Sequence, residues 1–277
     1  MRKHSSPGST GTTALYWMLL GSVFFSVAGM AVLLMAPQTA SRFGPLLPWF
    51  MKGPTWVYMV TVPLLVLLIY GRDLSWRTRI AAVAIGGGVG LTAELIGTNT
   101  GFPFGPYSYT DFLAPKILGD VPYLIPLSWY ATSVLAWDLA SRLEMKRTAR
   151  IGVGAAFMVL WDLALDPAMV AAFPVWQWHV DGFFHGMPFQ NLVGWFFTSV
   201  VILGAYDTII GAIKPAARSW TYRIWLASAA LPIGMAAVRG MWVAVSVGTV
   251  AVAVPMVMVA LKERARVSVL PAAQHAT

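Results

Sequence analysis

Long apolar stretches recur along the chain, and they constrain the fold more than any other feature of the sequence. Most of them reach or approach the roughly 20 residues that an α-helix needs to cross a hydrocarbon layer of about 30 Å. Charged residues make up only 11% of the 277 residues, against about 25% in a typical soluble domain. We therefore expect an all-α, polytopic transmembrane helical bundle that forms one membrane domain over residues 1–277 of a multi-pass protein of the cell membrane. The candidate spans are residues 14–36, 55–70, 80–96, 123–140, 151–172, 189–213, 220–238 and 241–261.

Basic residues are distributed unevenly over the segments between these stretches. With the N-terminus placed in the cytoplasm, fifteen of the 19 Lys and Arg residues fall inside, and only Arg42, Lys52, Lys116 and Arg239 fall outside. This is the bias that the positive-inside rule describes. The sequence therefore predicts about eight spans with both termini in the cytoplasm. We therefore attribute the net charge of +8 to the basic residues of the cytoplasmic segments, and we expect no nucleic-acid partner.

Several kinds of site are excluded or disfavoured by residue types and spacing. Cysteine is absent, which excludes disulfides, cysteine-ligated iron–sulfur clusters and thiol catalysis. No glycine-rich nucleotide fingerprint follows a predicted strand, and the three glycines at 86–88 are expected to permit close helix packing. His179, Asp181 and His185 lie close together in the sequence, but their spacing matches no helical zinc motif. We therefore predict neither a cofactor nor a bound metal ion.

Five acidic residues lie inside predicted spans, where a charge costs roughly 2.5–3.5 kcal/mol to insert and marks a functional candidate. Asp138 and Asp207 lie near the inner ends of their helices, close enough to basic loop residues to form ordinary ion pairs. At 1.5 Å per residue, Glu94 lies about 22 Å from the inner surface, and Asp162 and Asp166 lie about 18 and 24 Å from it. These three acids therefore occupy the outer half of the bilayer, and the two aspartates share one helix face because they are four residues apart.

The outer acids have no lysine or arginine at their depth in any predicted span. A carboxyl group in such surroundings tends to keep its proton, and neighbouring acids titrate as one coupled system. The cluster therefore predicts a proton donor beside a base, as general acid–base chemistry requires. The alternative is that the acids only hold helices together. The predicted site comprises Glu94, Asp162, Asp166 and Asn191.

Two outer loops, residues 97–122 and 173–188, are rich in glycine, proline and aromatic residues. Proline and aromatic packing restrict a loop, so we expect both to be ordered. Their rings either cover a site or form the aromatic belts that are common at membrane surfaces.

Two long motifs in this region resemble the integral-membrane carotenoid biosynthesis family, which includes CruF-type carotenoid hydratases and bisanhydrobacterioruberin hydratases. The resemblance covers about residues 80–200. The first motif comprises Glu94-Leu95-Ile96-Gly97 and TGFPFGPYSYT at residues 100–110. The second comprises WDLALDP at 161–167, WQW at 176–178 and GMPFQNLVGW at 186–195.

The resemblance implies hydration of the terminal 1,2 double bond of an acyclic carotenoid, without a cofactor. Asp162 or Asp166 would be the acid, Glu94 its partner, and Asn191 a group that positions water. Aromatic faces would stabilise the carbocation by about 0.5–2 kcal/mol each. The carotenoid would enter from the bilayer, and membrane lipid is the other expected partner. The predicted substrate-binding residues are Tyr107, Tyr109, Trp129, Trp161, Trp176, Trp178 and His185.

Other functions stay open from the sequence. Intramembrane acids also serve as proton relays in proton-coupled transporters, although no clear inverted repeat or pair of broken helices is present. A non-catalytic carotenoid-binding membrane protein would share the same rings. An intramembrane aspartyl protease is disfavoured, because Asp162 and Asp166 lie on one helix instead of facing each other from two.

Overall fold

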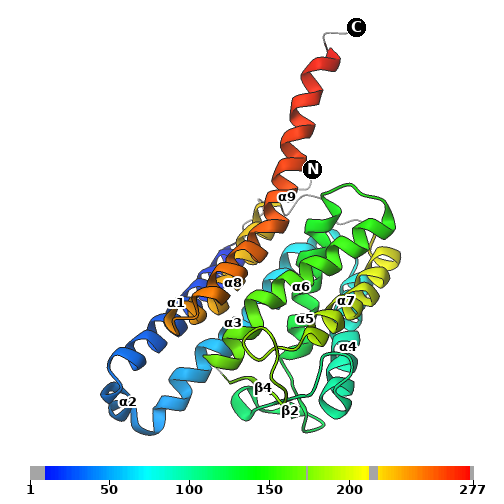
Figure 1. The fold of residues 1–277 in the computed structure, drawn as a ribbon. Helices are drawn as coiled ribbons and strands as arrows, with labels where there is room; N and C mark the ends of the chain where they lie inside the picture. Colours follow the sequence, from blue (N-terminus) through cyan, green and yellow to red (C-terminus); the bar gives the residue numbers. More distant parts are fainter. Residues whose placement is uncertain (1–9, 173, 212–217, 275–277) are drawn as a thin grey trace.

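The computed structural model describes residues 10–172, 174–211 and 218–274, and long helices dominate it (Figure 1). The described residues form eight helices of 17 residues or more, so the polytopic helical bundle expected from the sequence is confirmed. A short helix, α2 (Gln38–Phe43), lies between the first two. The long helices are α1 (Thr10–Met35), α3 (Leu47–Tyr70), α4 (Trp76–Thr100), α5 (Ile125–Ser141), α6 (Arg147–Ala171), α7 (Phe189–Ile209), α8 (Arg218–Val238) and α9 (Trp242–Gln274).

Six of the described helical segments are long and apolar enough to cross a membrane. They comprise α1, α2 together with α3, α4, α6, α7 and the Trp242–Arg266 part of α9. The other two long helices fall short of this criterion, because α5 has only 17 residues and α8 includes polar residues such as Arg223 that lower its mean hydropathy. The helix count agrees with the sequence analysis, whereas eight spans and cytoplasmic termini stay predictions.

Helix α5 lies at the centre of the bundle. It packs against α3, α4, α6 and α7 and also contacts α8 and α9. Thirteen of its 17 residues are buried, and Leu135, Ala136 and Trp137 are at most 1% exposed. Around it, α1 packs against α3 and α8, while α6 packs against α7, α8 and α9. Figure 1 shows α1 and α8 on one side of the bundle and α4 and α7 on the other.

The glycine run in α4 allows close helix contact at two of its three positions. A Cβ atom on Gly86 would lie 2.3 Å from the hydroxyl oxygen of Tyr206, and one on Gly87 would lie 3.2 Å from the carbonyl oxygen of Pro126. Gly88 faces open space. The packing expected from small residues in membrane helices is therefore present at Gly86 and Gly87.

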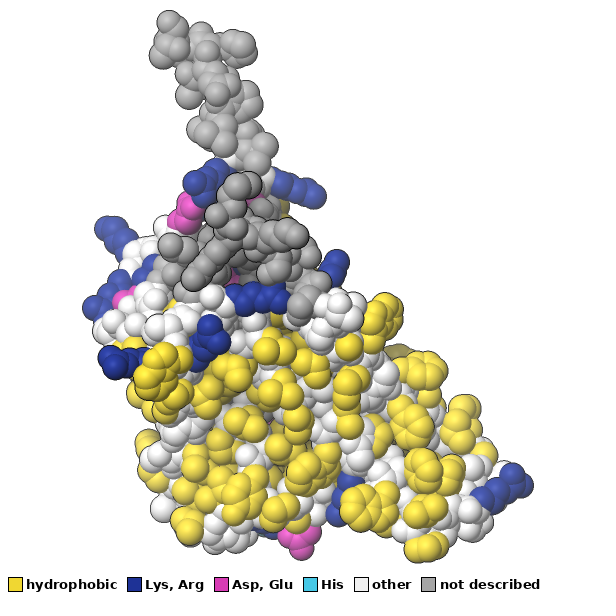
Figure 2. Space-filling view, turned by 180° about the vertical axis from the view of Figure 1, so that it is seen from behind, with side chains coloured by type: hydrophobic (Ala, Val, Ile, Leu, Met, Phe, Trp, Pro, Cys, Tyr) yellow, Lys and Arg dark blue, Asp and Glu magenta, His cyan; other side chains and the backbone are white. Residues whose placement is uncertain are grey.

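The surface of the bundle is apolar along its sides. Large hydrophobic side chains such as Trp17, Phe24 and Phe197 are 66%, 75% and 62% exposed. Figure 2 shows hydrophobic side chains over the flank and Lys and Arg side chains gathered toward one end. An apolar surface of this extent is a property of proteins that are covered by lipid or partners.

Short strands occupy the opposite end of the bundle, which we call the strand end. The strand β1 (Tyr107–Tyr109), between α4 and α5, pairs antiparallel with β4 (Trp176–Trp178), between α6 and α7. The strand β2 (Lys116–Ile117) pairs with β3 (Val121–Pro122). The described residues of the two outer loops are ordered as expected, and the pairing of the loops with each other was not predicted from the sequence.

Candidate active site

A cavity at the strand end contains the three carboxyl groups that the sequence analysis singled out. Helices α4, α5, α6 and α7 and the β1–β4 pair surround it. Its volume is about 50 Å³, which is room for a water molecule. We call it the acid cavity. The structure brings Glu94, Asp162, Asp166 and Asn191 together there, each at most 6% exposed.

Glu94 accepts hydrogen bonds from three aromatic side chains. The hydroxyl groups of Tyr107 and Tyr109 donate to its Oε2 atom at 2.5 and 2.8 Å, and the indole Nε1 of Trp129 donates to Oε1 at 2.9 Å. Burial, and then the charge of Glu94, raises the pKa of both tyrosines above the ordinary value of 10.0. The hydroxyl groups therefore keep their protons, and an indole N–H can only donate. Glu94 is held as an acceptor by neutral groups.

Two glycines on α4 make room for these rings. A Cβ atom on Gly90 would lie 2.4 Å from the ring of Trp129, and one on Gly97 would lie 2.9 Å from the hydroxyl oxygen of Tyr107. Gly90 and Gly97 lie about one turn before and after Glu94, on the same face of the helix. Their lack of side chains thus allows the donors to reach the carboxylate.

Asp162 and Asp166 lie one turn apart on α6 and are each oriented by a donor from another element. Asn191, in the first turn of α7, donates from Nδ2 to Asp162 Oδ2 at 2.6 Å. The indole Nε1 of Trp178, on β4, donates to Asp166 Oδ1 at 3.0 Å. The two aspartates therefore connect α6 with the helix and the strand that follow it.

The β1–β4 pair supplies aromatic rings to the acid cavity from both outer loops. Tyr107 lies opposite Trp178, and Tyr109 lies opposite Trp176. Side chains alternate between the two faces of a strand, so all four rings share the face that lines the cavity. Alternation of period two in the sequences YSY and WQW is a strand signal, and it was the available indication of this pairing.

Two predicted substrate-binding residues lie elsewhere. Trp161 is next to Asp162 in the sequence, but its ring lines a neighbouring apolar cavity and lies 4.9 Å from the ring of Trp225. His185 is exposed and packs edge-on against Phe184, outside the residues that line the acid cavity. Within the described residues, no group of three or more His, Cys, Asp and Glu side chains is arranged to hold a metal ion.

Other residues of the acid cavity were not predicted. Trp195 stacks on Trp129 with a centroid distance of 4.2 Å, and Phe104, Ile125, Ser128 and Leu165 also line the wall. Trp195 follows Asn191 by four residues, so helical periodicity places both on one face of α7. That spacing could have identified Trp195 from the sequence.

The other two acids inside the predicted spans, Asp138 and Asp207, form ion pairs as predicted. Asp138 forms an ion pair with Arg142, with a distance of 2.8 Å between the nitrogen and the carboxylate oxygen. Asp207 pairs with Arg147 at 2.7 Å and also with Arg150. Both acids lie at the end of the bundle opposite the strands, which we call the basic end.

Comparison with known proteins gives a consistent identification. The sequence model of a family described as carotenoid biosynthesis protein matches residues 54–255. Bisanhydrobacterioruberin hydratase of Haloarcula japonica is 35% identical over 118 residues, which are 41% of this chain and 40% of that protein. The match thus spans less than half the length of that relative. No solved structure matches the chain. Because the family match extends over most of the chain, this protein belongs to the carotenoid biosynthesis protein family.

Proposed function

We propose that this protein is a carotenoid hydratase that adds water to the terminal 1,2 double bond of an acyclic carotenoid end group. The observation that carries the proposal is the enclosure of three carboxyl groups in one cavity lined by aromatic rings. Its relative in Haloarcula japonica is named as a hydratase, which supports the same reaction class. The proposed reaction neither oxidises nor reduces the carotenoid and needs no cofactor.

The first proposed step is transfer of a proton from the aspartate pair to C2 of the substrate. Asp162 and Asp166 lie one turn apart on α6 and line one cavity, and in this proposal they exchange protons as one coupled system. The π electrons of the C1–C2 double bond form the new C2–H bond. The donor becomes a carboxylate, and C1 becomes a tertiary carbocation. A positioned general acid of this kind contributes about 10²–10⁴-fold to a rate.

The second proposed step is capture of the carbocation by water. The faces of Trp129 and Trp195 and the negative charge of Glu94 stabilise the cation while it exists. The water oxygen forms the C1–O bond, and the surplus proton passes to the carboxylate that gave up the first one. The carboxyl groups therefore end as they began. Asn191 orients Asp162 through its amide, and its proposed role is to position the water.

The proposal is tested by expressing the protein in a bacterium that makes lycopene and measuring the masses of the pigments. The expected product is heavier by one water, about 18 Da, and it disappears when Asp162 and Asp166 are both changed to Asn. Glu144→Gln is the matched control, because Glu144 is exposed and pairs with Arg266 away from the cavity. Pigment that stays bound to the protein with unchanged mass would indicate a carotenoid-binding protein instead of a hydratase.

A further inference from the structure

A second cavity lies beside the acid cavity, between α3, α5, α6 and α8. We call it the apolar cavity. None of the described residues that line it carries a charge. A charged ligand would therefore lose its hydration there without gaining an ionic partner. The walls are made mostly of hydrocarbon and aromatic rings, including Tyr58, Met59, Val62, Trp161, Met169 and Leu231.

The two cavities share one wall. Five residues line both of them, and they come from α5, α6, β4 and α7. The apolar cavity therefore lies directly beside the carboxyl groups, separated from them only by these side chains. The shared residues are Ile125, Ser128, Leu165, Trp176 and Trp195.

The lining of the apolar cavity extends along the bundle. Its lining residues on α6 run from Met169 to Trp161, a distance of about 12 Å at 1.5 Å per residue. On α5 they run from Ile125 to Thr132, which is about 10 Å. This shape suits a linear chain that continues from the acid cavity toward the middle of the bundle.

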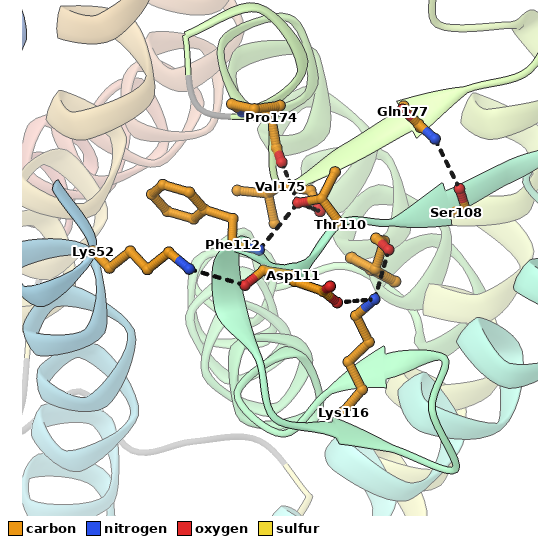
Figure 3. A network of polar contacts seen from close by, with 10 residues as sticks. Lys52, Ser108, Thr110, Asp111, Phe112, Lys116, Pro174, Val175 and Gln177 are labelled. Carbon is orange, nitrogen blue, oxygen red and sulfur yellow. Dashed lines mark hydrogen bonds and ion pairs between the residues drawn. The ribbon is translucent and has the colours of Figure 1, made fainter. Parts of the chain in front are cut away.

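Polar contacts close the strand end of the apolar cavity. Leu113 and Val175 line the cavity at this end. The backbone N–H of Thr110 donates to the carbonyl oxygen of Val175 at 3.0 Å, and Lys52 Nζ donates to that of Asp111 at 3.1 Å. Figure 3 shows the Thr110 side chain reaching Pro174 and Val175 and Lys52 reaching Asp111, which ties the first outer loop to the second and to α3. The polar groups at the strand end of the cavity thus form hydrogen bonds with one another, and the interior of the cavity is mostly apolar.

We propose that the apolar cavity binds the hydrocarbon chain of the substrate, next to the end group that reacts in the acid cavity. The occupant is a linear, uncharged polyene or isoprenoid, because the walls are apolar and uncharged and because the cavity adjoins the carboxyl groups. Which end group of the substrate reacts rests on the proposed function. Binding of the hydrocarbon chain of the substrate does not depend on any reaction. The cavity thereby sets which carbon atoms reach the acids.

The test compares two valine substitutions on α3. Val62 is 7% exposed and lines the apolar cavity, whereas Val60 is 37% exposed on the surface of the same helix. In lipid nanodiscs, quenching of tryptophan fluorescence reports the binding of lycopene. Val62→Phe fills the cavity and is expected to weaken binding at least about ten-fold, since two or more buried methylene groups lose their contacts. Val60→Phe is expected to bind as the wild type does.

The acid variants separate this inference from the proposed function. Asp162→Asn is expected to bind lycopene normally. Wild-type protein that binds lycopene at the apolar cavity without hydrating it would contradict the hydratase proposal and support the inference. Unchanged binding by a folded Val62→Phe protein would overturn the inference, and hydration by that protein would leave the hydratase standing.

A second variant covers the case in which Val62→Phe does not fold. The chain has no cysteine, so Thr132→Cys introduces one thiol into the apolar cavity with little change in volume. Bound lycopene at a saturating concentration should cover the introduced thiol. We therefore expect it to slow labelling of that thiol by N-ethylmaleimide at least about ten-fold. Val60→Cys serves as the lipid-facing control. Equal labelling of Thr132→Cys with and without lycopene, or no labelling at all, would overturn the inference.

Discussion

Both ends of this bundle hold buried acids, but their partners differ in kind. At the basic end, Asp138 is fully buried and accepts hydrogen bonds from Arg142, Tyr70 and Thr221. At the strand end, every hydrogen-bond donor to the three carboxyl groups in the described part of the chain is a neutral tyrosine, tryptophan or asparagine. The basic end therefore balances the negative charge of its acid with an arginine. The strand end offers its carboxyl groups no counterion among the described residues.

From this difference we infer two roles for buried acids in one protein, a structural role at the basic end and the proposed catalytic role at the strand end. An arginine beside a buried carboxylate offsets part of the desolvation cost of its negative charge. Neutral donors orient a carboxyl group without fixing its charge, so that it can still exchange a proton. Asp138 and Asp207 thus join helices, whereas the acids of the acid cavity are suited to chemistry. Substitutions at the two ends test whether their acids differ in this way.

The largest effect is expected from the Asp162→Asn, Asp166→Asn double variant. Amides keep the shape of both side chains but cannot release a proton, so hydration should fall by about 10²–10⁴-fold. The measurement is pigment mass after co-expression, with the amount of folded membrane protein determined in parallel. Full activity in the double variant would end the proposed assignment of the acid.

At the basic end, Asp138→Asn should affect stability and leave the chemistry intact. It leaves the guanidinium of Arg142, which is 6% exposed, buried without its anion, and loss of one partner of a buried pair costs about 3–5 kcal/mol. Denaturant unfolding in detergent micelles measures the loss. Hydration per folded molecule should equal that of the wild type. A variant that remains stable but inactive would show that the two ends do not differ in the proposed way.

A smaller effect is expected when one donor to Glu94 is removed. Tyr109→Phe deletes the hydroxyl that donates to Glu94 at 2.8 Å, and a hydrogen bond to a charged group is worth about 1.5–3 kcal/mol. Hydration should therefore fall by roughly ten-fold or more. Tyr206→Phe is the matched control, because it removes a buried hydroxyl that donates to the carbonyl oxygen of Ala82 instead. Equal losses in both variants would indicate a general loss of stability.

The smallest effect is expected at Asp111, an acid that is exposed at the strand end. The hydrogen bond from Lys116 and its positive charge hold the pKa of Asp111 below the ordinary value of 3.8. Its contribution to stability is therefore present above the unfolded-state pKa and is lost as the pH falls through the folded-state pKa. Asp111→Asn should lower the Tm slightly at neutral pH and not at all in strong acid. A Tm loss that persists in strong acid would contradict this origin.

The long helices of the fold and the three carboxyl groups of the site follow from local patterns in the sequence. Apolar length predicts the long helices, although α4 extends beyond residue 96 to Thr100 and α7 ends at Ile209, near the positive φ of Gly211. Helical rise places Glu94, Asp162 and Asp166 at one depth, and the structure encloses them in one cavity. These predictions succeed because hydrophobicity and helix geometry act over a few residues.

The contacts that define the site depend on residues far apart in the chain. Trp129 reaches Glu94 because Gly90 has no side chain, and the β1–β4 pairing brings Tyr109 beside Trp176. Local patterns did not reveal that Trp195 lines both cavities, that Trp161 faces the apolar cavity, or that His185 lies outside the acid cavity.

The class of fold and the long helices follow from the sequence alone, since both depend on the local balance of apolar and charged residues, and the expected depth of the acids stays a prediction. The donor that each carboxyl group receives and the rings that enclose the cavities are known from the three-dimensional structure. The physical reason is that a hydrogen bond or a ring contact requires atoms within a few ångströms. Helix packing and strand pairing set such distances between residues that the chain keeps 12 to 35 positions apart, as in Asp166 with Trp178 and Glu94 with Trp129.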